Sequence, residues 1–354
     1  MADERATSID RARVGVLSTA RNGVLSAIGN TPLVKLPNVL GDIPFNVYAK
    51  LEMLNPGGSI KDRTAISILE HGFDTGEIND DTVIVESSSG NMGIGLAQAC
   101  LQYGLRFVCV VDPKTTQQNI RLLEAYGAEL DYVSEPDPVT GEYLQARLNR
   151  VKYKLGTIAN SFWPNQYANL YNPKAHSRTM HEIVTQLDGQ LDYLFCATST
   201  CGTMRGCAEY VREHHLPTKI MAVDAVGSVI FGGPRKKRLI PGHGAAVTPA
   251  LFIPDLADRA IHVTDVDCIV GCRRLARKEA ILAGGSSGAV IMAVEKIQDS
   301  IEPDANCVVI FPDRGERYLD TIYSDDWIET HFGPLEYLFE NSDYPELMEV
   351  VETV

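Results

Sequence analysis

Short runs of apolar and β-branched residues alternate with helix-forming segments along most of the chain. A strand, a helix and a further strand in succession are typical of a βαβ unit, in which helices cover both faces of a parallel sheet. The alternation stops at residues 143–172, where a helical stretch precedes an aromatic, Asn-rich loop, and then resumes. We therefore predict an α/β protein with two halves and a cleft between them. The expected strands are 82–86, 106–111, 129–133, 192–198, 218–225 and 306–312, and the expected helices between the first three are 92–103 and 116–126.

Length and composition agree with this organisation. The chain has 354 residues, more than the roughly 250–300 at which one hydrophobic core stops growing. Hydrophobic residues make up 45% and charged residues 22% of the chain, which argues against disorder. The net charge of −14 disfavours binding to nucleic acid or anionic lipid. No stretch reaches about 18 apolar residues and the first residues lack an export signal, so we expect a cytoplasmic protein that binds neither membrane nor nucleic acid.

The eight cysteines form no recognisable metal or disulfide pattern. Cys268 and Cys272 are close in sequence, as are Cys201 and Cys207, but neither pair has a second pair of ligands beside it. A structural zinc site needs four ligands at suitable spacing, so we predict no metal site. The other four lie in apolar runs and are interpreted as small core residues: Cys100, Cys109, Cys196 and Cys307.

Two turns rich in Ser and Gly follow predicted strands and open predicted helices. One is residues 87–91 (SSSGN) and the other residues 199–203 (STCGT). The backbone N–H groups at a helix N-terminus have no intrahelical partner, so such a turn can bind a carboxylate or a phosphate. Two turns on different sheets could hold two different anions. The same residues are also ordinary helix caps, and this second interpretation stays open for either turn alone.

Lys61 stands directly after a Gly-rich turn, in residues 55–63 (NPGGSIKDR), and opens a predicted helix over 61–75. A cation is disfavoured at a helix N-terminus, so the pKa of this amine should be lowered. A neutral amine is what a Schiff base requires. The alternative is a solvent-facing lysine paired with Asp62. The predicted helix places four residues on one face: Ala65, Ile68, Leu69 and Gly72.

Three further segments have simpler interpretations. Residues 283–289 (AGGSSGA) follow a predicted helix over 273–282 and could be a connection between helices. The dense basic run at 232–238 (GGPRKKR) is interpreted as a solvated loop. Residues 1–27 are expected to form an amino-terminal arm, and residues 334–354, which carry acidic but no basic side chains, an acidic carboxy-terminal tail.

Together and in this order, these segments resemble the β-family of pyridoxal-phosphate (PLP) enzymes. This is the fold-type II group that includes cysteine synthase and cystathionine β-synthase. The resemblance covers residues 28 to about 330. It implies a tryptophan synthase β-like fold with two domains, each a mostly parallel twisted sheet flanked by helices, and PLP in the cleft between them. The matching segments are 28–33 (IGNTPL), 55–63, 88–95, 199–206, 283–289 and 312–319 (PDRGERYL).

The resemblance also implies which residues hold the cofactor. Lys61 is similar to the lysine that forms the Schiff base, and the same lysine would accept the substrate α-proton. Asn91 is similar to the residue that hydrogen-bonds the 3′-oxygen of the cofactor, and Ser286 to the group that faces the pyridine nitrogen. The expected phosphate-binding residues are Ser199, Thr200, Cys201, Gly202 and Thr203.

The substrate residues follow from the same resemblance. The group expected to bind the substrate α-carboxylate is Ser88, Ser89 and Gly90, with Gln166 from the aromatic loop. Met92 is expected beside the substrate too, and it stands where cysteine synthases have Thr. A neutral hydroxyl at Ser286 stabilises a protonated ring less than a carboxylate would. The resemblance therefore implies loss of a β-leaving group from a serine derivative, an enzyme-bound aminoacrylate and addition of a second nucleophile.

Some strings differ from cysteine synthases and resemble the siderophore-pathway branch, the N-(2-amino-2-carboxyethyl)-L-glutamate synthases. These strings are 227–232, 165–169, 109–113 and 312–315. Enzymes of this branch join O-phospho-L-serine to the amino group of L-glutamate on the way to 2,3-diaminopropionate. Because both substrates are anionic, extra cations are expected near the cleft. The candidates are Arg147 and Arg314, and we expect Arg147 and Tyr167 to contact the phosphoserine phosphate or the glutamate side chain.

Several further expectations come from the resemblance alone. Residues 28–51 with 156–333 should form the large PLP-binding domain, and residues 52–155 a smaller, mobile substrate domain. A homodimer acting on small amino-acid substrates is expected. The rival activities are cysteine synthase or O-phosphoserine sulfhydrylase, cystathionine β-synthase, and a homologue that has lost its chemistry.

Overall fold

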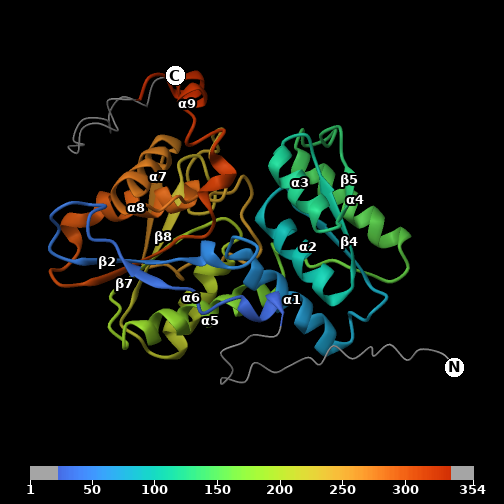
Figure 1. The fold of residues 1–354 in the computed structure, drawn as a ribbon, viewed down its shortest axis with the longest axis horizontal. Coiled ribbons are helices and arrows are strands. Elements are labelled where there is room, and N and C mark those ends of the chain that lie inside the picture. The colour runs from blue at the N-terminus through green and yellow to red at the C-terminus, as the bar shows by residue number, and fades with distance from the viewer. Residues whose placement is uncertain (1–22, 336–354) are drawn as a thin grey trace.

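The computed structural model describes residues 23–335, which form two lobes, each built on its own sheet (Figure 1). The larger sheet has six strands in the order β1-β2-β10-β7-β8-β9. Only β1 is antiparallel to its neighbour, and the other pairs are parallel. The strands are β1 (Leu33–Lys35), β2 (Asn46–Lys50), β7 (Tyr193–Ala197), β8 (Lys219–Ala225), β9 (Arg259–Val263) and β10 (Asn306–Ile310).

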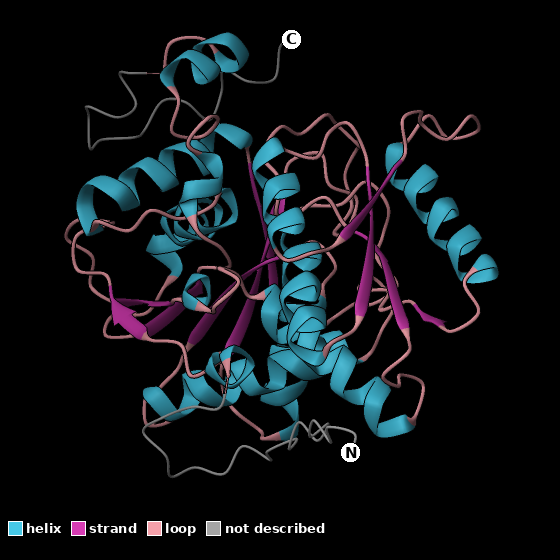
Figure 2. Cartoon of the chain, turned by 45° about the vertical axis from the view of Figure 1, so that its right-hand side comes forward, coloured by secondary structure: helices cyan, strands magenta, loops and turns pink. Residues whose placement is uncertain are grey.

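The smaller sheet has four parallel strands in the order β5-β4-β3-β6. Its strands are β3 (Val83–Ser87), β4 (Arg106–Val111), β5 (Glu129–Tyr132) and β6 (Ser161–Phe162). In both sheets the long central strands are buried on both faces, as β-branched and apolar runs require. Figure 2 shows the two groups of strands with helices around each.

Helices cover both faces of each sheet. The α-helices are α1 (Lys61–Thr75), α2 (Asn91–Tyr103), α3 (Gln117–Ala125), α4 (Tyr143–Thr157), α5 (Tyr171–Gln186), α6 (Gly202–Glu213), α7 (Asp265–Glu279), α8 (Gly285–Ile297) and α9 (Asp325–Phe332). Short 3₁₀ turns lie at Val24–Ala27, Glu52–Leu54, Gln298–Ser300 and Gly315–Tyr318. On the large sheet, α7 and α8 pack against one face and α5 and α6 against the other. On the small sheet, α1, α2 and α3 cover one face and α4 the other.

The predicted fold class is confirmed, and the predicted elements are close to the observed ones. Helix α1 has the predicted bounds, and its predicted inner face is buried. The six predicted strands differ from the observed ones by at most two residues at either end. Strands β1, β2, β6 and β9 were not predicted, because each is short or lies outside the βαβ alternation.

The helix predicted over 273–282 is wrong at both ends. Helix α7 begins at Asp265, where Thr264 and Asp267 form a capping box, and ends at Glu279 with Ala280 in the left-handed conformation. A Thr followed three residues later by an Asp is a readable start signal. The apolar residues that follow it support the earlier start, since Cys268, Ile269 and Cys272 are all buried.

The predicted domain limits stay predictions. Strand β6 lies just beyond the predicted boundary at residue 155 and pairs with β3 of the small sheet. The expected arm and acidic tail fall outside the described residues, apart from residues 23–27 and 334–335. Within the described part of the chain, no helix is long and apolar enough to cross a bilayer.

Candidate functional site

The two Ser- and Gly-rich turns lie at the carboxyl ends of parallel strands, one in each lobe. The 199–203 turn joins β7 to α6, and the 87–91 turn joins β3 to α2. The carboxyl edge of a parallel sheet is where α/β proteins bind ligands. The prediction that the two turns belong to different sheets is confirmed.

Free donors line the 199–203 turn. The backbone N–H groups of Thr200, Cys201 and Thr203 make no hydrogen bond to any described residue. Only the N–H of Gly202 has a partner, the hydroxyl of Thr200 at 3.3 Å. Unpaired N–H groups at the positive end of a helix dipole suit an anion such as phosphate.

Backbone geometry explains two residues of this turn. A Cβ on Gly202 would lie 2.2 Å from Oδ1 of Asn172, so only glycine fits there. Cys201 has a φ of 65°, in the left-handed region that favours glycine, and its side chain is buried. Burial raises the pKa of the Cys201 thiol to about 12, so it is an uncharged thiol beside the turn.

The 87–91 turn both caps a helix and leaves donors free. The Ser88 hydroxyl accepts hydrogen bonds from the N–H groups of Gly93 at 2.9 Å and Gly90 at 3.3 Å. This is the capping that the simpler interpretation predicted. The N–H groups of Ser89, Asn91 and Met92, however, have no partner among the described residues. The turn can therefore bind a carboxylate as well.

Lys61 is the first residue of α1 and is half-buried. Its side-chain amine makes no ion pair or hydrogen bond to any described residue, so the alternative of a pairing with Asp62 is not what the structure shows. Asp62 is buried and accepts a hydrogen bond from the N–H of Gly57. Burial lowers the pKa of the Lys61 amine, and the charge of Asp313 partly opposes that shift. The result is an amine that loses its proton more readily than an exposed lysine.

A chain of polar contacts surrounds Asn91. Its Nδ2 donates to Oδ2 of Asp313 at 2.8 Å, and its Oδ1 accepts from the guanidinium of Arg317. These two contacts determine the orientation of the amide and leave one N–H free. Tyr318 donates to the same Asp313 oxygen at 2.6 Å, while the other oxygen, Oδ1, is buried without a partner. Asp313, Arg317 and Tyr318 were not predicted as site residues, although the 312–319 string that contains them was quoted.

Ser286 lies in the first turn of α8 and is buried. A Cβ on Gly242 would contact its hydroxyl at 3.5 Å, so glycine at 242, where φ is 99°, keeps the space around that hydroxyl open. The hydroxyl has no hydrogen-bond partner among the described residues. Ser286 can therefore bind a polar atom of a ligand without carrying a charge itself.

Gln166 brings the aromatic loop to the small lobe. Its backbone N–H donates to Oε2 of Glu86 at 3.4 Å, and its side-chain amide has no partner within the described part of the chain. Glu86, which the sequence reasoning missed, also accepts from Trp163 Nε1 at 2.9 Å and from the N–H of Ser87 at 2.8 Å. Burial raises the pKa of Glu86 to about 7, although these donors oppose the shift. Glu86 thus joins the loop to the 87–91 turn.

Arg147 lies on α4 and is buried, so the alternative of an exposed helix position is wrong. Its Nε is 3.1 Å from Oδ2 of Asp112, which directly follows β4. Its Nη1 is buried and has no hydrogen-bond partner within residues 23–335. Tyr167 is near enough for the charge of Arg147 to affect its pKa, which burial raises overall. Arg147 is therefore a buried cation with an unused donor at the carboxyl edge of the small sheet.

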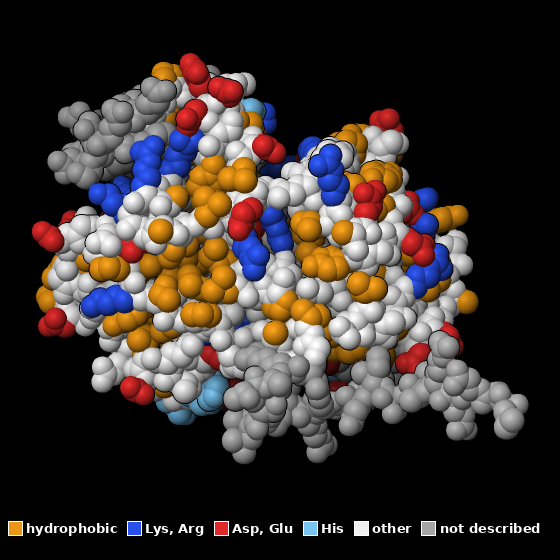
Figure 3. All heavy atoms as spheres, viewed as in Figure 1, with side chains coloured by type: hydrophobic (Ala, Val, Ile, Leu, Met, Phe, Trp, Pro, Cys, Tyr) orange, Lys and Arg blue, Asp and Glu red, His pale blue; other side chains and the backbone are white. Residues whose placement is uncertain are grey.

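The other two basic features differ from Arg147. The Nε of Arg314 donates to the carbonyl of Met53 at 3.0 Å, which ties it to the backbone. The 232–238 segment is mostly exposed, as predicted, and its Arg235 pairs with Glu142 at the start of α4. Figure 3 shows basic side chains gathered around the hollow between the two lobes.

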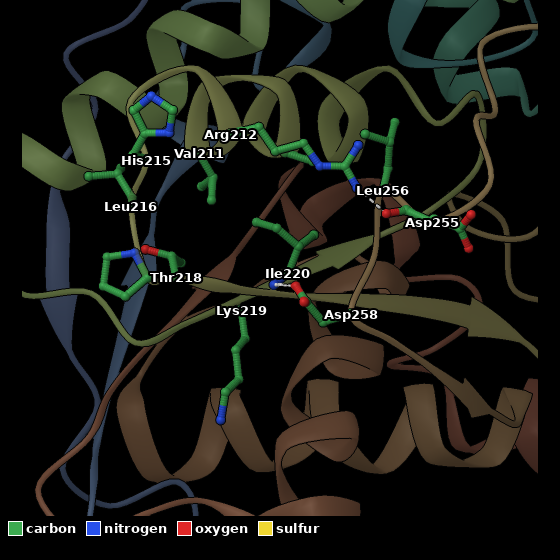
Figure 4. Close-up of a pocket in the computed structure, with 12 residues that line it drawn as sticks. Val211, Arg212, His215, Leu216, Thr218, Lys219, Ile220, Asp255, Leu256 and Asp258 are labelled. Atoms are coloured by element: carbon green, nitrogen blue, oxygen red, sulfur yellow. Dashed lines mark hydrogen bonds between the residues drawn. The ribbon is translucent and has the colours of Figure 1, made fainter.

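A separate pocket of about 460 Å³ lies at the opposite edge of the large sheet. Figure 4 shows it between the end of α6, the start of β8 and the 255–258 segment, with Arg212 bonded to the carbonyl of Asp255. Lys219 and Ile220 are at the amino end of β8, whereas the 199–203 turn follows the carboxyl end of the neighbouring parallel β7. This pocket is not part of the site. Among the described residues, no group of three His, Cys, Asp or Glu side chains could hold a metal ion, and all eight cysteines are buried and free.

Comparison with known proteins agrees with this geometry. Residues 24–313 match the family described as pyridoxal-phosphate dependent enzyme. An O-acetylserine dependent cystathionine β-synthase from Helicobacter pylori is 32% identical, with a TM-score of 0.80 over 87% of this chain and 100% of that one. A hydrogen sulfide-producing enzyme from Fusobacterium nucleatum is 34% identical, with a TM-score of 0.80 over 86% and 100% of the two chains. An O-ureido-L-serine synthase is 30% identical, with a TM-score of 0.78 over 87% and 98%.

The chain therefore belongs to the pyridoxal-phosphate dependent enzymes. Its fold is the fold-type II architecture, and its cofactor is PLP. Within that family it is of the cysteine synthase and cystathionine β-synthase type, whose chemistry is β-replacement or β-elimination on small amino-acid substrates.

The residues present suit this cofactor. PLP carries a phosphate, a pyridine nitrogen, a ring oxygen and an aldehyde carbon, and each needs a different partner. The structure offers the free N–H groups of the 199–203 turn, the Ser286 hydroxyl, the spare amide hydrogen of Asn91 and the amine of Lys61. The roles of these side chains remain those predicted from the sequence.

Proposed function

We propose that the chain replaces the phosphate of O-phospho-L-serine with the amino group of L-glutamate, which forms N-(2-amino-2-carboxyethyl)-L-glutamate and releases phosphate. This product is a precursor of 2,3-diaminopropionate, a building block of siderophores and antibiotics. The proposal rests on one structural observation: Arg147 is buried, its Nη1 has no partner among the described residues, and its charge acts on Tyr167, the residue after Gln166. A cation in that place suits a second anionic group on a substrate.

The chain's own groups would bind the substrate carboxylate and transfer the α-proton. The free N–H groups of Ser89, Asn91 and Met92, with the Gln166 amide, would hold the α-carboxylate. Bound PLP supplies the electron-withdrawing group that acidifies the Cα hydrogen of the substrate. Lys61 would accept that proton and return it after the new bond has formed, a role suited to an amine whose pKa is lowered by burial.

The two substrates account for every bond that breaks or forms, and no further reactant is needed. The Cβ–O bond of phosphoserine breaks, and phosphate takes the electron pair. The amino nitrogen of glutamate then forms a bond to Cβ and loses a proton. Closure of the cleft, which we propose by analogy with related enzymes, would exclude water from the reacting carbon.

A second candidate is cysteine synthase or O-phosphoserine sulfhydrylase, with sulfide in place of glutamate. The names of two similar proteins favour it, because one is called a hydrogen sulfide-producing enzyme and one an O-acetylserine dependent cystathionine β-synthase. Sulfide has no carboxylate and needs no second cation. A dependence on Arg147 that appears only with glutamate as the second substrate would therefore separate the two activities.

The deciding experiment is a competition followed by mass spectrometry. The PLP-loaded protein is incubated with O-phospho-L-serine and equal amounts of L-glutamate and sulfide. The proposal expects the glutamate adduct as the main product. Cysteine as the dominant product would refute it and support the second candidate.

Variants at Arg147 then test the observation that carries the proposal. Arg147→Ala removes a charged donor, so the KM for its ligand should rise about 10- to 100-fold. The matched control is Arg150→Ala on the same helix, because Arg150 pairs with Asp131 and is 42% exposed. If Arg147 binds the phosphate, sulfide-dependent turnover falls as well, and if it binds glutamate, only the glutamate reaction falls. Unchanged turnover with both phosphoserine and glutamate subsaturating would rule out both roles.

A further inference from the structure

Two residues of α5 stand directly behind the 199–203 turn. Asn172 and His176 are one helical turn apart, and both are completely buried. The Nδ2 of Asn172 donates to the Thr200 hydroxyl at 3.2 Å and to the carbonyl of Gln166 at 2.8 Å. Its Oδ1 accepts from the Thr64 hydroxyl at 3.3 Å. Asn172 therefore contacts the 199–203 turn, the aromatic loop and the helix that begins at Lys61.

His176 makes an equivalent set of contacts. Its Nε2 is 3.3 Å from the hydroxyl oxygens of both Thr203 and Thr64. Its Nδ1 is 3.4 Å from the hydroxyl of Thr179. Burial, together with the charges of Lys61 and Arg63, lowers the pKa of this imidazole well below its usual value. The ring is therefore neutral and carries one hydrogen, on either Nε2 or Nδ1.

The position of that hydrogen decides what Thr203 can do. The Thr64 hydroxyl is 3.3 Å from both Oδ1 of Asn172 and Nε2 of His176, so its single hydrogen is donated to one of the two. If the ring hydrogen is on Nδ1, Nε2 can only accept, and the Thr203 hydrogen is spent on it whenever Thr64 donates to Asn172. If the ring hydrogen is on Nε2, the Thr203 oxygen accepts instead and its own hydrogen stays free.

The Thr200 hydroxyl already has its hydrogen free to donate. Its oxygen accepts from Asn172 Nδ2 and from the N–H of Gly202, so its hydrogen can only be donated outward. A phosphate has acceptor oxygens and no donor near neutral pH, so it binds a turn whose hydroxyls donate. With hydrogen on Nε2 of His176, the Thr203 hydroxyl would keep its hydrogen free to donate, as the Thr200 hydroxyl does.

We propose that His176 is a positioning residue for the cofactor phosphate, which in its Nε2–H form keeps the hydroxyl hydrogen of Thr203 free to donate to a phosphate oxygen. Asn172 does the same for Thr200. The role concerns the cofactor that the whole family requires and does not depend on which substrates the enzyme uses. The role of His176 would therefore still hold if the substrates proposed above were wrong.

The test compares two ligands that differ only in the phosphate. Full-length protein is freed of cofactor, and its dissociation constants for PLP and for pyridoxal are measured by absorbance and tryptophan fluorescence. In His176→Met, binding of PLP should weaken about 10- to 100-fold, the effect of one hydrogen bond to a charged group. Binding of pyridoxal should change less than about twofold, because the lost bond acts on the phosphate. In His176→Gln, whose amide can donate from a similar position, PLP binding should be largely restored.

A structural role predicts a different result. If His176 only supports the fold, both ligands weaken equally, and His176→Gln gives no selective recovery. Equal losses would overturn the proposal. If the His176 variants do not fold, Thr203→Val and Thr203→Ser replace them, and only the former should lose PLP selectively.

A measurement on the unaltered protein provides an independent check. ¹⁵N NMR of histidine-labelled protein distinguishes a protonated from an unprotonated ring nitrogen. The proposal requires hydrogen on Nε2 of His176 and a bare Nδ1, both with and without inorganic phosphate. A ring protonated on Nδ1 would refute it.

Discussion

Lys61 and Asp313 show how burial and a neighbouring charge act on a single side chain. Burial disfavours the charged amine, and the carboxylate of Asp313 favours it. The two effects have opposite signs, and burial is the larger. The amine is therefore partly neutral nearer to physiological pH than an exposed lysine, which suits both Schiff-base formation and proton transfer.

This balance predicts the reactivity of Lys61. In protein freed of cofactor, Lys61 should react with an amine reagent at lower pH than the same residue does in unfolded protein, where its pKa is near 10.5. Asp313→Asn should lower the reaction midpoint further, since it removes the stabilising anion. Labelling at a series of pH values, read by peptide mass spectrometry, measures both. An upward shift in Asp313→Asn would contradict the electrostatic account.

Cys201 provides a second prediction from a single residue. Its φ of 65° is unfavourable for any residue with a Cβ, but the buried thiol contributes apolar contacts. Two variants separate these effects, since both lack the thiol. Cys201→Gly should be more stable than Cys201→Ala by roughly 1 kcal/mol, because only alanine keeps the backbone penalty. Denaturant unfolding measures the difference, and equal stabilities would show that the turn relaxes without cost.

Among the elements, close helix crossings shape the walls of the site. Helices α7 and α8 cross at Gly271 and Gly288, where a Cβ on Gly288 would lie 2.1 Å from the carbonyl of Cys268. Helix α8 also carries Ser286 in its first turn. Helices α5 and α6 cross in the same way at Gly206, where an added Cβ would lie 2.0 Å from the carbonyl oxygen of Pro173. Backbone cannot move aside as a flexible side chain can, so these crossings require glycine.

This packing predicts opposite effects for two glycines that are both inside helices. Gly288→Ala should destabilise the protein by about 3 kcal/mol through overpacking. Gly156→Ala on α4, where nothing lies within 4 Å of the added carbon, should stabilise it by about 0.5–1 kcal/mol through helix propensity. Thermal or denaturant unfolding of the two variants measures the contrast. A similar cost for both would show that the α7–α8 crossing adjusts to a larger residue.

Across the whole molecule, a buried ion network joins the sheet to two helices. Lys50 of β2 and Arg63 of α1 both contact Glu182 of α5, at 2.9 Å and 2.7 Å, and Arg63 also pairs with Glu52 at 2.6 Å. Burial alone would raise the pKa of Glu182, but the hydrogen bonds and charge of Arg63, with Lys50, lower it to about 2. The network holds α1, and with it Lys61, against the large lobe.

The buried carboxyls predict how stability varies with pH. The pKa of Glu182 falls to about 2, so its stabilisation is present above its ordinary pKa of 4.5 and is lost as the pH falls toward 2. The pKa of Glu86 rises to about 7, so its stabilisation is present below 4.5 and is lost as the pH rises toward 7. Each shift corresponds to about 3 kcal/mol. These two groups together predict greatest stability near pH 4.5.

Single variants separate the two slopes. Glu182→Gln should reduce the slope on the acid side of the stability curve. Glu86→Gln should reduce, but not abolish, the slope between pH 5 and 7, because burial also raises the pKa of Asp62 to about 7. Urea unfolding at a series of pH values measures both, and each variant serves as the control for the other. If either variant changed the acid side and the pH 5–7 side of the stability curve equally, the assignment of one slope to each carboxyl group would be wrong.

Much of the fold was predictable because it depends on short-range patterns. The β-rich runs, the bounds of α1 and the two turns were all found from periodicity and from Ser and Gly at strand ends. The supporting residues Asn172, His176, Glu86 and Asp313 were not found. The contacts that bring them to the site join positions from 27 to 222 residues apart, and the sequence near each carries no local signal.

The sequence by itself determined the α/β class, the two Ser- and Gly-rich turns at strand ends and the place of Lys61 at a helix start, because helix periodicity, capping and glycine conformations act over a few neighbouring residues. Only the tertiary structure decided that Arg147 is buried, that Lys61 pairs with none of the described residues and that His176 lies behind the 199–203 turn. Burial depends on what packs against a residue from distant parts of the chain. It is also burial that moves a pKa or leaves a donor unpartnered, so the chemistry of the site depends on the fold as much as on its residues.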